Sequence, residues 1–247
     1  MKLKVVIKLS FLFCLFFART VFCENISEVE LIRLTDKVMI HRSYYDIGSG
    51  TIYPANGLII LGSDSLIMVD TPWTNEQTRN LIKLLSDNFH RKISLALFTH
   101  AHNDRIGGIS TLISEGIPGM ANLATCFRAF KDGYSVPELL DFDHKINLDQ
   151  IRIEYFFPGA GHTPDNSVVW LPNEKILFGG CFIKSYDSKS LGNLAEANVS
   201  EWQVSLRRIV KKFPKAEIVV PGHGDPGGKE LIDHTLQLSR EYLSKSE

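Results

Sequence analysis

Two patterns of apolar and polar positions run along the chain, and each predicts one kind of element. Short apolar runs bounded by turn residues predict strands, and they occur at residues 29–34, 38–45, 57–62, 65–70, 93–98, 151–157, 167–172, 175–180 and 216–223. Apolar residues that recur every three or four positions predict helices, and they occur at residues 71–85, 123–130, 200–213 and 228–243. Each half of the chain therefore contains several strands followed by strand–helix units.

Two such halves favour two sheets packed face to face with helices outside, a four-layer αββα sandwich of the α/β class. Two helix starts are also marked in the sequence. Thr74 is the expected N-cap of the first helix, with Gln77 three residues later as in a capping box. Ser200 is expected to cap the helix over residues 200–213.

The first 23 residues differ from the rest of the chain. Lysines precede an apolar run over residues 11–18, which is shorter than the roughly 20 residues that a membrane-spanning helix needs. This pattern predicts a signal peptide over residues 1–23, a mature domain over residues 24–247, and a periplasmic location without stable membrane association. Lipid attachment at Cys23 is the weaker alternative, because Phe22 is too large for that type of cleavage site.

Composition narrows the classes of function. The 247 residues are 44% hydrophobic and carry a formal net charge of -1 at pH 7, so no basic field predicts binding to nucleic acid. Removal of residues 1–23 would make the domain mildly acidic and leave two of the four cysteines, Cys126 and Cys181. An exported protein could join them in a disulfide, or one of them could bind a metal.

The stretch FTHAHNDRIGG, residues 98–108, holds the most specific chemical pattern. His100, His102 and Asp104 occupy alternate positions directly after a predicted buried strand. Continued as a strand, this spacing would point all three side chains to one face. A metal ion would satisfy two imidazoles and a carboxylate there, so the spacing predicts a metal site.

Other ligand-type residues follow apolar strands and lie in glycine-rich or proline-containing loops, where functional side chains usually stand. They are His162, Cys181 and His223. Imidazole together with thiolate favours zinc over magnesium or calcium, and we expect two zinc ions per chain. The first would bind His100, His102 and His162 and keep one tetrahedral position open for water, as in catalytic zinc sites. The second would bind Asp104, Cys181 and His223.

The remaining histidines and Cys126 have plainer interpretations. A single histidine is more often a hydrogen-bonded or surface residue than a ligand, and we assign that role to His41, His90, His144 and His234. Cys126 lies in a predicted helix without a neighbouring ligand. It is expected to be a small buried apolar residue.

The segments THAHNDRIGG, GAGHTPDN, GGCFIK and PGHGDPGG together resemble the metallo-β-lactamases of class B, subclass 1. The resemblance covers nearly the whole chain after residue 23, in order and with matching spacing. It implies the metallo-β-lactamase fold, two zinc ions, and hydrolysis of the β-lactam amide bond by a metal-bound hydroxide, which gives antibiotic resistance. Penicillins, cephalosporins and carbapenems are the expected small-molecule substrates, and we expect a monomer.

The resemblance also implies roles for single residues. Asp104 would orient the attacking hydroxide. Lys184, three positions after Cys181, would bind the substrate carboxylate by its charge, with a solvated surface lysine as the alternative. Asn193 would assist at the developing oxyanion, and a turn-forming asparagine is an equally weighted alternative.

Apolar contacts with the substrate are implied for Trp73 and for a mobile flap over residues 46–57. In the flap, Ile52 and Tyr53 would touch the substrate, and Gly48 and Gly50 would provide freedom of movement. A plain hairpin loop is the alternative interpretation of this segment.

Arg105 directly follows Asp104. Strand-like alternation would point its guanidinium away from the metals and beneath the site, where five donors could bond the loops that carry Cys181 and His223. The alternative is an exposed arginine that begins a helix over residues 105–113, although helix N-termini disfavour cations.

Two other functions fit parts of the pattern. One is another zinc hydrolase of the same fold, such as a thioesterase or lactonase. Those relatives usually have a histidine where Arg105 stands, and the ligand role of Cys181 and the spacing of Lys184 also count against them. The other is a non-enzymatic zinc-binding exported protein, which the open position of the three-histidine site disfavours, because structural zinc sites are closed.

Overall fold

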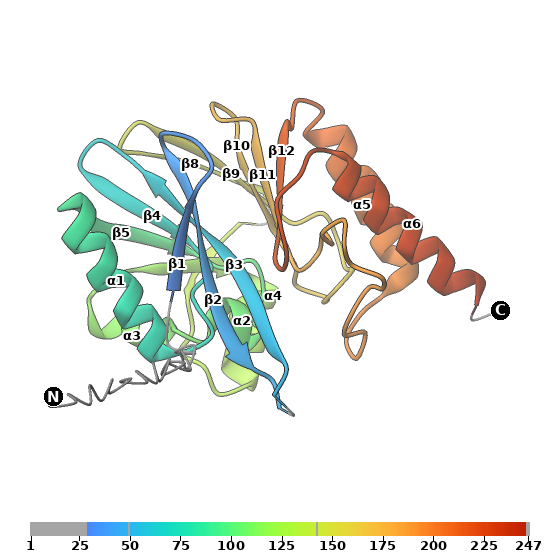
Figure 1. Cartoon of the computed structure of the whole chain (residues 1–247), viewed down its shortest axis with the longest axis horizontal. Coiled ribbons are helices and arrows are strands. Elements are labelled where there is room, and N and C mark those ends of the chain that lie inside the picture. Colours follow the sequence, from blue (N-terminus) through green and yellow to red (C-terminus); the bar gives the residue numbers. More distant parts are fainter. Residues whose placement is uncertain (1–28, 49, 142, 246–247) are drawn as a thin grey trace, which may run out of the picture.

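The computed structural model describes residues 29–245 apart from positions 49 and 142. Two sheets pack face to face with helices on both outer sides (Figure 1), so the predicted αββα sandwich is confirmed. The predicted signal peptide over residues 1–23 lies outside the described residues. Of the helices in the described part of the chain, none is long and apolar enough to span a bilayer.

The first sheet has seven strands in chain order. They are β1 (Val29–Arg33), β2 (Val38–Asp46), β3 (Ile52–Leu61), β4 (Ser65–Val69), β5 (Lys92–Leu97), β6 (Gly119–Asn122) and β7 (Glu138–Leu140). Neighbours pair antiparallel from β1 to β4 and parallel from β4 to β7. The outer face is covered by α1 (Asn75–Phe89), α3 (Ile109–Ser114) and α4 (Leu123–Lys131).

The second sheet has five strands in the order β12-β11-β10-β9-β8. They are β8 (Asp143–Leu148), β9 (Ile151–Phe156), β10 (Val168–Leu171), β11 (Ile176–Gly180) and β12 (Ile218–Pro221). Helices α5 (Val199–Lys212) and α6 (Glu230–Ser244) cover its outer face, on the right of Figure 1. The pair β11 and β12 is parallel, whereas the other pairs are antiparallel.

Three hydrophobic clusters separate the four layers. Leu58 and Ile60 of β3 pack in the cluster between the sheets, while Ile59 packs under the helices of the first sheet. Trp202 of α5 packs in the cluster on the second sheet. Strands that are buried on both faces show continuous apolar runs instead of alternation, which is why the sequence marked them clearly.

Thr74 is the N-cap of α1, as predicted, because its side chain accepts a hydrogen bond of 3.1 Å from the Gln77 backbone N–H. The prediction for Ser200 is wrong. Asn198 caps α5 by accepting from the Glu201 backbone N–H at 3.0 Å, and the Ser200 hydroxyl donates to the Asn198 side chain. Asparagine and serine are equally good N-cap residues, and Asn198 lies only two residues before Ser200. Residue type alone therefore did not show which of them caps the helix.

Three strands were missed for reasons that the structure makes clear. β6 and β7 are only four and three residues long, too short to show a period. β8 is longer but alternates exposed with half-buried positions at an edge of the second sheet. Its charged residues suit an edge strand, where they discourage pairing with other chains, and they hide the apolar signal.

Candidate metal centre

The chain leaves strand geometry before the histidine motif. β5 ends at Leu97, and a short helix α2 (Asn103–Ile106) begins with His102 as its N-cap. The expectation that His100, His102 and Asp104 continue a strand is therefore wrong, as is the alternative of one helix over residues 105–113. The side chains still converge, because a bend followed by a helical turn brings the three residues round to one side.

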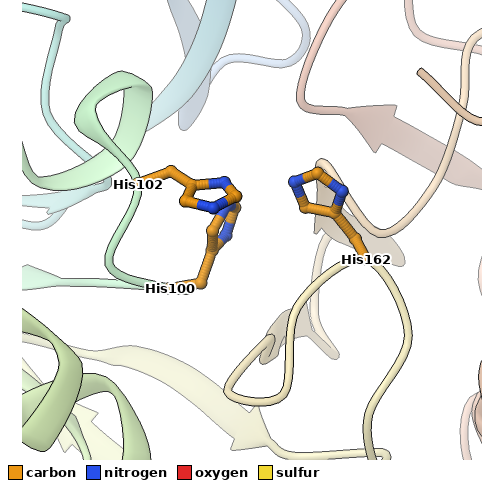
Figure 2. Close-up of side chains that lie close together, drawn as sticks. All are labelled: His100, His102 and His162. Atoms are coloured by element: carbon orange, nitrogen blue, oxygen red, sulfur yellow. The ribbon is translucent and has the colours of Figure 1, made fainter. Parts of the chain in front are cut away.

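Three imidazoles form a compact triangle. The ring centroids of His100, His102 and His162 lie 4.8, 5.1 and 5.1 Å apart, with planes nearly perpendicular to one another. Figure 2 shows His162 reaching from its own loop toward the other two rings. Each residue offers one nitrogen to a group of ligand atoms that lie within 4.8 Å of one another, which is a suitable spacing for three ligands of one metal ion.

Hydrogen bonds outside the triangle determine which nitrogens are free. His102 Nε2 contacts the Glu196 carboxylate at 2.8 Å, so its Nδ1 is left for a metal. His100 Nδ1 lies 3.3 Å from the Thr99 hydroxyl. Within the described residues, His100 Nε2 and His162 Nδ1 are buried nitrogens without a hydrogen-bond partner. Burial lowers the pKa of both rings well below the usual value, which keeps them neutral and able to bind a metal.

A second triad adjoins the first. Asp104 Oδ2, Cys181 Sγ and His223 Nε2 lie 3.1 to 3.2 Å from one another. His223 Nδ1 contacts the Pro54 carbonyl at 2.6 Å, which leaves Nε2 directed at the other two ligand atoms. Burial raises the pKa of the Cys181 thiol, with Arg105 opposing the shift. A metal ion would displace that proton, because thiolate is the ligand form.

Arg105 lies under this second triad and is fully buried. Its guanidinium donates to Asp104 at 2.8 Å and to the Gly222 carbonyl, next to His223, at 2.9 Å. It also donates to the Asn56 carbonyl and lies 3.4 Å from Asp70. The expected strand alternation is not what places it there, since Arg105 belongs to α2, and the alternative of an exposed arginine is wrong.

Arg105 also determines the charge of Asp104. Burial alone would raise the pKa of this carboxyl, but Arg105 and His223 outweigh it and hold the pKa well below the usual range. Asp104 is therefore a carboxylate, the form that binds a metal.

Lys184 is nearly buried, at 9% exposure, so it is not an ordinary surface lysine. Its ammonium lies 5.4 Å from the ring centroid of Trp202, and burial lowers its pKa. Asn193 is exposed, and its side-chain oxygen accepts from the Ala195 backbone N–H at 3.0 Å, which is the geometry of a turn-forming asparagine.

Aromatic residues gather beside His223. Trp73 stacks on Tyr45 at 5.3 Å and lies 6.2 Å from the His223 ring. Tyr53 meets the same ring edge-on at 6.4 Å. Ile52 and Tyr53 are 40% and 44% exposed at the start of β3, so this part of the hairpin presents apolar side chains to solvent beside the second triad.

Several residues of the site escaped the sequence analysis. Glu196 contacts His102, and Arg128 contacts Asp165 in the His162 loop, across long sequence separations that no spacing marks. Asp70 had a weak signal, because it ends a buried apolar strand; it bonds the Thr99 backbone N–H and hydroxyl, both at 2.8 Å. His41 is buried and bonds the Asp70 carbonyl at 3.0 Å, in agreement with its interpretation as a hydrogen-bonded histidine.

Comparison with known proteins adds family relationships to this geometry. The family model described as the metallo-beta-lactamase superfamily matches residues 50–223. A protein of Bacteroides fragilis named metallo-beta-lactamase type 2 is 38% identical over 220 residues, which cover 89% of this chain and 88% of that protein.

Two solved structures are similar over the same region. A metallo-beta-lactamase from Pontibacter korlensis has a TM-score of 0.84 and 35% identity, and the match covers 86% of this chain and 99% of that one. A metallo-beta-lactamase from Pseudomonas aeruginosa in its mono-zinc form has a TM-score of 0.81 and 36% identity, with coverages of 87% and 96%.

The buried position of Arg105 leads to a stability prediction. We expect Arg105→Ala to lower the free energy of unfolding of the metal-free protein by about 3–5 kcal/mol, because Asp104 and Asp70 would remain buried without their cation. Urea denaturation measures this loss. Arg33→Ala is the control, since its ion pair with Asp36 is exposed and contributes about 0–1 kcal/mol. An Arg105→Ala protein as stable as that control would contradict the prediction.

Proposed function

The chain belongs to the metallo-beta-lactamase superfamily and hydrolyses β-lactams, and we propose that it does so with two zinc ions, one in each ligand triad. One observation carries the proposal. The two triads adjoin, and in the first of them the buried Nε2 of His100 has no hydrogen-bond partner among the described residues. A metal ion would supply that partner, and three imidazoles beside a site with a thiol favour zinc.

The residues of the protein prepare the site for this chemistry. Zinc bound in the triads would supply a Lewis acid for the lactam carbonyl and lower the pKa of a water molecule toward neutrality. Burial keeps the imidazoles of His100 and His162 neutral. Asp104 stays a carboxylate beside Arg105, so it can accept a hydrogen bond from the attacking water and orient it.

Substrate contacts are proposed for residues around the triads. Lys184 would pair its ammonium with the substrate carboxylate, and its partial burial makes this charge pairing stronger than on an open surface. Trp73, Ile52 and Tyr53 would contact apolar parts of the substrate beside His223. Asn193 would have to release its bond to the turn before its side chain could reach a substrate carbonyl.

Turnover of a chromogenic cephalosporin tests the function directly. The mature protein should hydrolyse it, lose activity with a chelator, and regain activity with added zinc. A panel that adds a penicillin and a carbapenem tests the proposed substrate range. Hydrolysis of thioesters or lactones without hydrolysis of any β-lactam would favour the other zinc hydrolases of this fold. Zinc binding without turnover of any of these would indicate a binding protein.

Cys181 provides a separate test of the second triad. We expect about two zinc ions per mature wild-type chain and a loss mainly from the second site in Cys181→Ser, because a hydroxyl is a poorer zinc ligand than a thiolate. Metal analysis after dialysis measures this. Cys126→Ser is the matched control, since Cys126 lies in α4 and contacts backbone carbonyls. A Cys181→Ser protein that holds both ions at wild-type affinity would exclude Cys181 as a ligand.

Lys184 should affect hydrolysis through its charge. We expect Lys184→Ala to weaken transition-state binding by about 1.5–3 kcal/mol, the scale of a charged hydrogen bond, and Lys184→Arg to retain part of it. Steady-state kinetics on a β-lactam with a free carboxylate measures this. Lys189→Ala removes an exposed lysine five residues further on and should change little. Wild-type kinetics in Lys184→Ala would remove the carboxylate-binding role.

Export and monomeric state are also part of the proposal. The lysines and the apolar run over residues 11–18 support cleavage of a signal peptide near residue 23 and a periplasmic location. N-terminal sequencing of protein from a periplasmic extract would test the first point. A full-length chain found only in the cytoplasmic fraction would exclude it. Sedimentation of the mature chain as a dimer would exclude the monomer.

A further inference from the structure

A chain of charged groups connects the first ligand triad to a neighbouring loop. We name the loop over residues 191–198 the Asn193 loop. Its residue Glu196 contacts His102 Nε2 at 2.8 Å and accepts from the guanidinium of Arg128 on α4. Arg128 lies 3.2 Å from the buried carboxylate of Asp165, which in turn accepts from the Ala101 backbone N–H at 3.0 Å. The connections therefore leave the ligand loop at residue 102 and return to it at residue 101.

These contacts place a fixed negative charge against a metal-ligand imidazole. The hydrogen bond from Arg128 holds the pKa of Glu196 below its usual range, so Glu196 is a carboxylate. Arg128 is well shielded, with 16% of its side chain exposed, and Asp165 is fully buried. Arg128 lies between the carboxylates of Asp165 and Glu196. It therefore fixes the position of Glu196, which in turn contacts His102.

The Nε2 atom of His102 faces Glu196, and its proton decides whether the contact is attractive. A neutral imidazole carries its proton on either nitrogen. When a metal binds Nδ1, the proton must be on Nε2, and Nε2 then donates to Glu196. The carboxylate favours this same tautomer before a metal binds, because the other tautomer would point a lone pair at it, and the Nδ1 lone pair is then left for the metal. A metal at Nδ1 would fix the ring in place and polarise its Nε2–H bond, which strengthens the hydrogen bond to Glu196.

We propose that Glu196 and Arg128 are positioning residues that couple metal binding at the three-histidine triad to the placement of the Asn193 loop. The proposal rests on the metal site described under the proposed function. Glu196 lies three residues from Asn193. Leu194 packs on the second-sheet cluster, and the described polar contacts of residues 192–195 are within the loop or with Ser190. Metal at His102 thus orders the loop through its Glu196 end. Coupling between two sites is reciprocal, so a well-placed Glu196 also strengthens metal binding.

Hydrogen exchange tests the coupling in the mature protein with and without zinc. Peptides that cover the Asn193 loop should exchange about 5-fold or more slowly in the zinc-bound wild type, at the lower end of typical coupling between sites. Glu196→Leu and Arg128→Met should lose most of this zinc-dependent difference. Glu196→Gln keeps an acceptor for His102 and should retain part of it. Glu217→Gln is the control, because it removes a glutamate that pairs with Lys175 just before β12 and β11 begin. The Asn193 loop of this variant should respond to zinc as in wild type.

The comparison of metal-free with zinc-bound protein separates coupling from a simple structural role. If Glu196→Leu speeds exchange of the loop equally in both states, Glu196 only supports the loop and the proposal is wrong. Zinc affinity gives a second readout, measured by chelator competition in a Cys181→Ser background, where the three-histidine triad is isolated. Glu196→Leu should lower it about 10–100-fold, the usual effect of a group that orients a ligand; an unchanged affinity would overturn the proposal.

Metal content distinguishes this inference from the proposed function. A wild-type chain that binds no zinc would overturn both. A chain that binds zinc and hydrolyses β-lactams, but whose loop exchanges at the same rate with and without zinc, would overturn the coupling alone. Far-UV circular dichroism of each variant identifies loss of folding, and the conservative Glu196→Gln protein keeps the test decisive if the leucine variant unfolds.

Discussion

The buried guanidinium of Arg105 is the interaction on which the second triad depends. It bonds Asp104 in its own helix, the Asn56 carbonyl of β3 and the Gly222 carbonyl beside His223. Three segments that are distant in the chain therefore share one cation. A buried cation is stable only when its N–H donors have hydrogen-bond acceptors. The positions of these three segments therefore follow from the need to supply acceptors to Arg105. The same cation keeps Asp104 ionised and ready to bind a metal.

The ligand set is divided between the two halves of the sandwich. His100, His102 and Asp104 follow the first sheet, whereas the other three candidate ligands follow strands of the second. Neither half has a complete triad, so the site exists only after the sheets pack on their shared hydrophobic cluster. Each triad is then attached to a different neighbouring segment. His102 contacts Glu196 of the Asn193 loop, and His223 contacts the Pro54 carbonyl at the base of the flap hairpin.

Local patterns in the sequence were reliable where one physical cause dominated. Continuous apolar runs marked the strands that are buried on both faces, and Thr74 was recognised because its side chain satisfies a helix N–H three residues away. Predictions failed where two local solutions were equivalent. Asn198 and Ser200 are both good caps, and His-x-His-x-Asp suits a strand as well as the bend and helical turn that the protein uses. Edge strands such as β8 were hidden by their charged residues.

The sequence by itself determined the fold class and the chemical type of the site. Local properties of the chain led to both conclusions. The spacing of apolar residues led to the αββα sandwich, and imidazole, carboxylate and thiol groups in glycine-flanked loops led to a metal-dependent hydrolase. The tertiary structure alone decided which nitrogen of each imidazole is free, that Arg105 is buried beneath Asp104, and that Glu196 and Arg128 support His102. These features are contacts between residues up to 117 positions apart. Such contacts form only when separate elements pack together, and they leave no regular spacing in the sequence.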